Sequence, residues 1–177
     1  MRRFMSGAAG WVVLTMAVTA QAYEWQSYNG HQYALTQDNL TWAAAENEAV
    51  SAGAHLVTIN DAAENDWLVQ TFGNIPAPIA WIGYYQGANS QWSWISGEPV
   101  TYTNYFWEFP QGGIHAYIHL RVNLPGGVTQ PGEWNANPLQ DNPETPLYCP
   151  PGIIEVVPEP VTSSLLMLGG LAILRRR

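Results

Sequence analysis

The stretch Trp81-Ile82-Gly83-Tyr84-Tyr85 restricts the fold of this 177-residue chain more than any other segment. Its aromatic and β-branched residues favour a β-strand, and the run Trp92-Ser93-Trp94-Ile95 has the same character. The two runs predict two successive strands in the middle of the chain. The length fits one domain.

Two helices are predicted before these strands. Residues 41–50 are rich in alanine, Thr41 can cap the start of this helix, and Gly53 can close its end. A second helix is expected to begin at Asp61, where Glu64 completes a capping box, and to end at Gly73. The predicted buried faces hold Trp42, Ala45 and Ala49 in the first helix and Trp67, Leu68 and Phe72 in the second.

Further strands are predicted on both sides of this central part. Asn29-Gly30 between aromatic segments indicates a hairpin. Residues 55–59 and 152–156 resemble short strands, and residues 115–122 alternate so that one face is apolar. Residues 97–113 are rich in glycine, proline and asparagine and predict a long loop. This order predicts an α+β domain with long loops, which are often functional.

The catalytic signals in the sequence are weak. His115 and His119 are expected on the outer face of their strand, about 13 Å apart, which is too far to share one zinc ion. The chain contains no Gly-x-Ser-x-Gly motif, no Cys-His pair and no glycine-rich phosphate loop. We therefore expect a binding protein, not an enzyme.

The order and identity of these segments resemble the C-type lectin-like domain. The resemblance covers residues 23–157 and implies an α+β, C-type-lectin-like fold, with two helices packed on small antiparallel sheets and a long loop region. The matching segments are Leu40-Thr41-Trp42, residues 53–60, Trp81-Ile82-Gly83, Trp92-Ser93-Trp94, Gly97, residues 102–105, Gly132-Glu133-Trp134-Asn135 and Ile153-Ile154-Glu155.

The disulfides of that family are absent from this chain. The resemblance places Ala49 and Ile154 where a disulfide joins the first helix to the last strand, which implies that apolar packing replaces the bridge. Ala116 and approximately Leu139 stand at the positions of the second disulfide. The one cysteine, Cys149, is expected in a loop, either as an incidental thiol or as an intermolecular bridge.

The resemblance also implies a candidate calcium site in the long loop. Family lectins bind sugar through one Ca²⁺ held by two triplets, which fall here on Phe109-Pro110-Gln111 and Trp134-Asn135-Ala136. Phe109 and Ala136 cannot ligate, so Glu108, Gln111 and Asn135 are the remaining candidate metal and ligand-binding residues. Calcium is a candidate cofactor of reduced affinity, because fewer carboxylates hold it. Asn135 has the alternative role of a structural hydrogen-bonding residue.

Aromatic residues gather in the same loop. Tyr105, Phe106, Trp107 and Phe109 lie within five positions of one another. Aromatic rings stack on sugar faces and anchor protein interfaces, so Trp107 is a candidate ligand-binding residue. The alternative is that these rings fill a small core of the loop itself.

Both ends of the chain resemble processing signals. Residues 1–22 have a basic start, an apolar run and the cleavage-type sequence Ala20-Gln21-Ala22, as in a secretory signal peptide. Residues 158–177 contain Pro158-Glu159-Pro160, then an apolar stretch, then Arg175-Arg176-Arg177. This tail resembles the PEP-CTERM sorting signal of polysaccharide-secreting bacteria, which an exosortase reads. It implies a short transmembrane segment that anchors the protein transiently.

The charge of the part between these ends limits the partners. Residues 23–160 hold one arginine and fourteen acids, a net charge of −13. Such a surface repels phosphate, so nucleic acid is excluded and membrane contact is expected only through the tail. We expect an exported carbohydrate-binding protein of the bacterial cell envelope, linked to exopolysaccharide or another glycan. The alternative is a calcium-independent protein-binding or adhesive module that uses the same loop.

Overall fold

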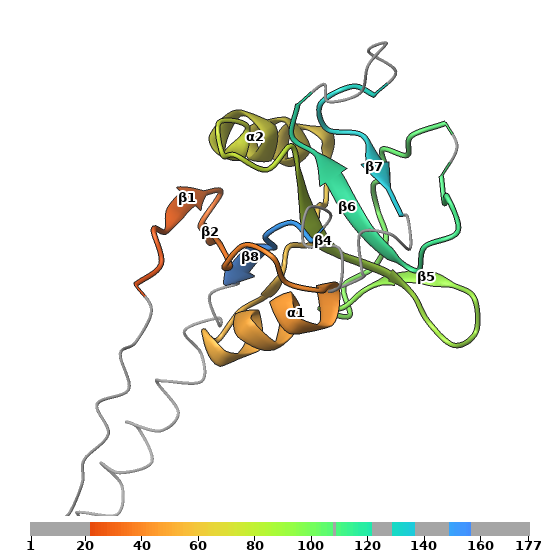
Figure 1. The fold of residues 1–177 in the computed structure, drawn as a ribbon, viewed down its shortest axis with the longest axis horizontal. Coiled ribbons are helices and arrows are strands. Elements are labelled where there is room, and N and C mark those ends of the chain that lie inside the picture. The colour runs from red at the N-terminus through yellow and green to blue at the C-terminus, as the bar shows by residue number, and fades with distance from the viewer. Residues whose placement is uncertain (1–21, 108, 122–128, 137–148, 157–177) are drawn as a thin grey trace, which may run out of the picture.

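The computed structural model describes residues 22–107, 109–121, 129–136 and 149–156. These residues form two helices and two four-stranded antiparallel sheets (Figure 1). The predicted α+β class is therefore confirmed. The strands of the first sheet are, in order, β1 (Gln26–Tyr28), β2 (His31–Leu35), β8 (Ile153–Val156) and β3 (His55–Leu56). Those of the second are β5 (Trp92–Trp94), β4 (Ile79–Gln86), β6 (His115–His119) and β7 (Trp134–Asn135).

The predicted hairpin joins β1 to β2. Asn29 and Gly30 occupy the turn with φ angles of 47° and 87°, and Tyr28 pairs with His31 across it. Two consecutive positive φ angles define the turn whose twist matches paired strands, and asparagine followed by glycine tolerates them best. The hairpin places β2 beside β8, so both ends of the domain share one sheet.

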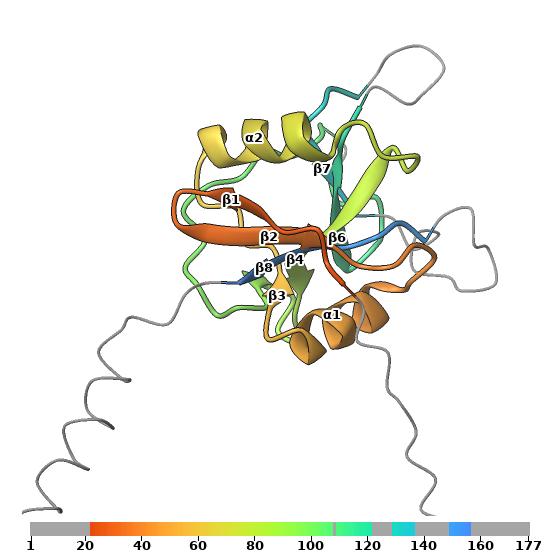
Figure 2. The same ribbon diagram turned by 90° about the vertical axis from the view of Figure 1, so that its left-hand side faces the viewer.

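Helix α1 (Trp42–Ser51) begins where the sequence predicts. The Thr41 hydroxyl accepts a hydrogen bond from the Ala44 amide at 3.3 Å. At the first residue of the helix, the Trp42 indole donates to the Ile82 carbonyl of β4 at 2.8 Å. This bond fixes the start of α1 to the second sheet. The two helices lie on opposite sides of the first sheet (Figure 2).

Helix α2 (Ala62–Phe72) has the predicted cap, with one difference. The Asp61 side chain accepts from the Glu64 amide at 2.8 Å. The Glu64 carboxylate does not return this bond to Asp61, as a capping box requires, but accepts from the Asn60 amide at 2.8 Å. The reason is that Glu64 is buried, and its other oxygen accepts from the Tyr33 hydroxyl at 2.6 Å.

Gly83 lies where the two sheets meet. Its amide donates to the Val57 carbonyl at 2.9 Å, and its carbonyl accepts from the Ile95 amide at 2.8 Å. A β-carbon at this position would lie 2.5 Å from the Leu56 carbonyl oxygen. Only glycine allows the backbone of β4 to approach residues 56–57 this closely. The most restrictive segment of the sequence therefore holds the two sheets together.

Two predicted strands differ from the structure. The strand expected at residues 55–59 ends at Leu56, because the amide of Val57 bonds to Ile153 of the first sheet while its carbonyl bonds to Gly83 of the second. The strand at 115–122 ends at His119, and its predicted outer face is wrong. Tyr117 and His119 are both buried, because this face of the sheet is covered as well.

The positions of the family's first disulfide are packed together. Ala49 on α1 and Ile154 on β8 are fully buried and belong to one hydrophobic cluster with Ala45, Leu56 and Trp81. Apolar packing at this point agrees with the implied replacement of the bridge. Cys149 is buried, and its carbonyl accepts from the Asn39 amide at 3.1 Å. Leu139 lies outside the described residues.

Candidate functional site

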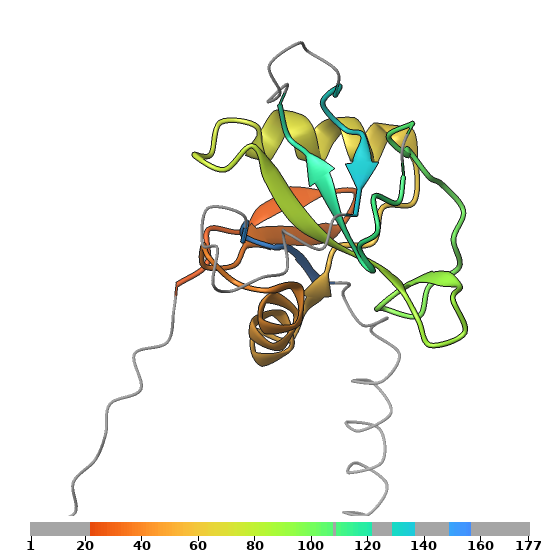
Figure 3. The same cartoon turned by 45° about the vertical axis from the view of Figure 1, so that its right-hand side comes forward.

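The loop between β5 and β6, residues 97–113, is the candidate ligand-binding site, and we call it the long loop. Its middle is anchored on β7: the Phe106 amide donates to the Trp134 carbonyl at 2.9 Å, and the Trp134 amide donates to the Asn104 carbonyl at 2.7 Å. Asn104 also donates through its side chain to the Gly132 carbonyl at 2.9 Å. The long loop lies on the side of the domain away from β1 (Figures 1 and 3). Backbone anchoring of this kind gives exposed side chains a fixed position.

A chain of aromatic rings connects the core to the long loop. Tyr105 stacks on Phe109 with ring centroids 4.3 Å apart and planes 8° apart. Phe109 contacts Trp92 at 4.7 Å, and Trp92 stacks on the buried Tyr84 at 5.2 Å. The hydroxyl groups of Tyr84 and Tyr105 are hydrogen-bonded at 2.6 Å, and burial raises the pKa of the Tyr84 hydroxyl. The loop aromatics are therefore supported from beneath by the core.

The four loop aromatics divide between the two predicted roles. Phe106 is 3% exposed and fills the space under the loop, and Phe109 is partly buried. Trp107, the next residue after Phe106, is 72% exposed, and Tyr105 is 41% exposed. Phe106 and Phe109 thus fill the core of the loop, whereas Tyr105 and Trp107 are available to contact a ligand. Only Trp107 and Tyr105 present large ring surfaces to a ligand.

The residues at the family's calcium positions lie partly together. Asn135 donates from its side-chain amide to the Gln111 side-chain oxygen at 3.0 Å, and its own oxygen accepts from the Ala136 amide at 2.8 Å. The side-chain oxygens of Gln111 and Asn135 therefore both accept a hydrogen bond within the protein. Glu108 lies outside the described residues. Within residues that the structure describes, no three His, Cys, Asp or Glu side chains converge to hold a metal ion.

The histidines of β6 have different surroundings. The His115 ring stacks on Trp42 with centroids 4.4 Å apart and planes 5° apart. His119 is 5% exposed, and neither of its ring nitrogens has a hydrogen-bond partner among the described residues. Burial lowers the pKa of His119 to about 4, because a buried imidazolium without a partner loses its hydration. The sequence predicts both on an outer face, but His119 is buried and His115 is half-buried.

A buried polar cluster between β2, β8 and α2 was not predicted. The Glu155 carboxylate accepts from the Thr58 amide at 3.1 Å, pairs with His31 and lies 3.5 Å from the Tyr33 hydroxyl. Tyr33 also bonds to Glu64. Burial raises the pKa of both carboxyl groups. The one signal in the sequence was an acid, Glu155, inside an apolar strand, because a buried acid requires partners.

The signal-peptide segment, the sorting motif Pro158-Glu159-Pro160 and the rest of the tail lie outside the described residues. Neither α1 nor α2, the helices of the described part, is long and apolar enough to span a bilayer.

Three comparisons with known proteins agree with this geometry. A model of the lectin C-type domain matches residues 38–119. A snaclec anticoagulant protein of Deinagkistrodon acutus is 30% identical over 113 residues, which cover 59% of this chain and 77% of the relative. C-type lectin domain family 4 member F of Rattus norvegicus is 36% identical over 87 residues, 48% of this chain. The solved structure of SPL-2 from Saxidomus purpuratus has a TM-score of 0.58 and 21% identity, and covers 75% of this chain and 90% of that one.

These matches define a domain of the lectin C-type class. The chain belongs to the C-type lectin domain family, and its two helices and two sheets have the C-type-lectin-like fold that the sequence predicts. Four curated relatives, among them the rat protein, are matched over only 14–26% of their own length. Members of this family bind carbohydrate or protein, and the long loop carries the exposed aromatic residues suited to either.

Proposed function

We propose that this chain is an exported carbohydrate-binding protein of the bacterial cell envelope and not an enzyme. Its long loop holds a glycan by aromatic stacking, without calcium. SPL-2, which shares the fold, is described as a calcium-independent C-type lectin. The internal hydrogen bonds of Gln111 and Asn135 support the same mode, because a calcium ion would have to share these oxygens with the N–H groups that they already accept from.

The observation that carries this proposal is the exposure of Trp107. A tryptophan that is 72% exposed next to a buried Phe106 projects its ring into solvent from an anchored backbone. An exposed indole on a fixed loop presents a flat apolar surface to the C–H face of a sugar ring. Tyr105, stacked on Phe109, adds a second ring with a hydroxyl group.

The sequence at both ends supports the cellular part of the proposal. Residues 1–22 act as the signal peptide, residues 23–157 form the lectin-like domain, and residues 158–177 form the sorting tail. An exosortase reads Pro158-Glu159-Pro160 while the apolar segment holds the chain in the membrane. The ligand is then an exopolysaccharide or another surface glycan. The negative charge of residues 23–160 disfavours anionic partners, so a neutral glycan is expected.

Replacement of Trp107 tests the binding site. We expect Trp107→Ala to weaken binding to a neutral polysaccharide by about 5- to 30-fold, which corresponds to about 1–2 kcal/mol for one stacked ring. Trp107→Phe should recover part of the affinity. Isothermal titration calorimetry measures both values, and thermal melting should stay within about 2 °C of the wild type because the ring is exposed.

The control is Val50→Ala on α1, which removes an exposed apolar side chain (53% exposed) outside the long loop. This variant should bind as the wild type does. If Trp107→Ala binds polysaccharide normally, the long loop is not the glycan site.

A second function is favoured by one observation. Val100, Ile114 and Tyr105 are exposed together with Trp107 in or next to the long loop. Aromatic and aliphatic anchors of this kind also form the centres of protein interfaces. If the protein has this calcium-independent protein-binding or adhesive role, the wild type should capture a protein partner and should not bind polysaccharide. Ile114→Ser should then impair capture of the protein partner.

A further inference from the structure

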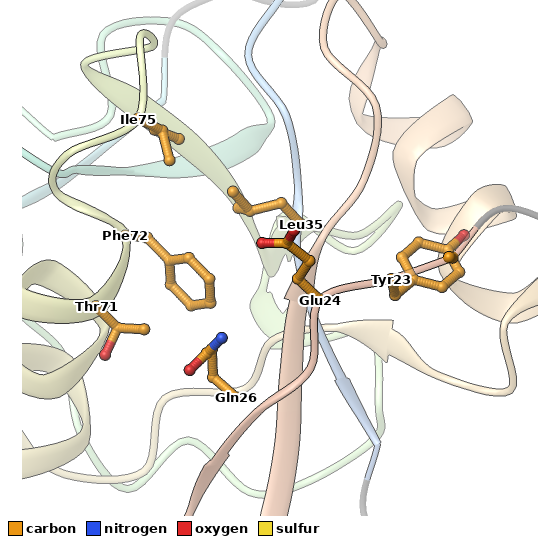
Figure 4. Close-up of a pocket in the computed structure, with 8 residues that line it drawn as sticks. Tyr23, Glu24, Gln26, Leu35, Thr71, Phe72 and Ile75 are labelled. Carbon is orange, nitrogen blue, oxygen red and sulfur yellow. The ribbon is translucent and has the colours of Figure 1, made fainter.

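A cavity of about 520 Å³ lies between the C-terminal end of α2 and the segment that leads into β1 (Figure 4). This volume is in the range of pockets that hold small organic molecules. The long loop is on the other side of the domain, so the cavity is separate from the proposed glycan site (Figure 1). Its residues include apolar Leu35, Phe72 and Ile75 and polar Glu24, Gln26 and Thr71.

The cavity has an apolar wall and a polar rim. Phe72, at the end of α2, is 5% exposed, and Leu35 and Ile75 are partly buried beside it. Glu24 and Gln26 come from the opposite side, and their polar ends project into the space in front of the Phe72 ring (Figure 4). A molecule with an apolar body and one polar end fits this arrangement.

The charges around the cavity favour a ligand whose polar end is positively charged. Among the residues described, the Glu24 carboxylate has neither an ion-pair nor a hydrogen-bond partner, and its side chain is exposed. The last turn of α2 has no basic residue to balance the partial negative charge at the C-terminal end of the helix. The chain has no lysine, and Arg121, the one cation of residues 23–160, donates to the Pro76 carbonyl.

We propose that this cavity is a second binding site, for a small organic cation with an apolar body. The ammonium group pairs with Glu24 and faces the C-terminal end of α2. The apolar body packs against Phe72, Leu35 and Ile75. This site does not depend on glycan binding by the long loop.

Three ligands of one shape test the proposal on the full-length chain. Phenethylamine, phenethyl alcohol and 3-phenylpropionate carry a positive, a neutral and a negative end on the same ring. The full-length chain is used because residue 23 then carries an amide, whereas cleavage after Ala22 would leave an α-ammonium group next to Glu24 that competes with the ligand. Saturation-transfer NMR titrations give the three affinities. We expect the amine to bind about fivefold more tightly than the alcohol, the ratio that about 1 kcal/mol of ion pairing gives, and the acid not to bind.

Variants assign the effect to the cavity. Glu24→Gln keeps the size of an exposed side chain and should make the amine and the alcohol bind equally. Ile75→Trp should reduce the binding of both by filling the cavity. Asp66→Asn, which removes an exposed acid from an earlier turn of α2, should change neither. Equal binding of amine and alcohol to the wild type, or an unchanged amine affinity in Glu24→Gln, would overturn the proposal.

Discussion

Gly83→Ala is expected to destabilise the domain by about 2–6 kcal/mol. The new β-carbon would lie 2.5 Å from the Leu56 carbonyl oxygen and 3.1 Å from that of Val57, both of them backbone atoms. Relief requires β4 to move away from β3, which strains the Gly83–Val57 hydrogen bond between the sheets and the Ile95–Gly83 bond next to β5. Overpacking alone costs about 1–3 kcal/mol, and weakened buried hydrogen bonds add about 1–3 kcal/mol.

Gly87→Ala is the matched control, because its β-carbon would meet no atom closer than 3.4 Å. Urea unfolding followed by circular dichroism compares the two variants. The control should stay within about 1 kcal/mol of the wild type, the usual range for an accommodated substitution. Equal stability of both variants would mean that the contact between the sheets is not as close as the structure shows.

His119 is expected to make the domain acid-sensitive. Its pKa falls from 6.5 to about 4 in the folded state. The folded protein therefore disfavours the imidazolium. The contribution of neutral His119 to the free energy of unfolding is complete above pH 6.5 and is lost as the pH falls towards 4. A shift of this size corresponds to about 3 kcal/mol. Glu64 and Glu155 act in the opposite sense, because their raised pKa values favour the folded state as the pH falls.

His119→Phe separates these contributions because it leaves both carboxyl groups in place. The variant should be more stable than the wild type at pH 7 by about 1–2 kcal/mol, since it removes two buried nitrogens that have no partner in the described part of the chain. It should also lose less stability than the wild type between pH 7 and pH 4. His119→Leu is a second variant that tests the same expectation if a phenyl ring does not fit at this position. Parallel pH profiles for wild type and both variants would show that His119 is hydrated in the folded protein.

The sequence was sufficient for the elements whose signals are local. Residue chemistry at short range predicts the Asn29-Gly30 turn and the caps at Thr41 and Asp61. The family pattern predicts the close packing of Ala49 with Ile154. Local signals could not show that β6 is covered on both faces. An alternating pattern predicts one exposed face, but here the second face is buried as well, together with His119.

The candidate site was predictable only in part. The family pattern brought Gln111 and Asn135 to neighbouring positions, and the structure places them in contact. It could not show that their oxygens are used within the protein, because this depends on side-chain orientation. The exposure of Trp107 beside the buried Phe106 depends on how the loop lies on β7, a non-local contact. The cluster of Glu64 and Glu155 joins residues 91 positions apart, so Glu155 inside its apolar strand indicates a buried acid but not its partners.

The most direct measurement of the central claim is the affinity of the full-length chain for a neutral polysaccharide in calcium and in EDTA. Stacking on Trp107 and Tyr105 requires no metal ion, and the Gln111 and Asn135 oxygens already accept internal hydrogen bonds. We therefore predict the same affinity in both buffers, and a loss of binding in Trp107→Ala in both. Binding that disappears in EDTA and returns with calcium, with Trp107→Ala unaffected, would contradict the account.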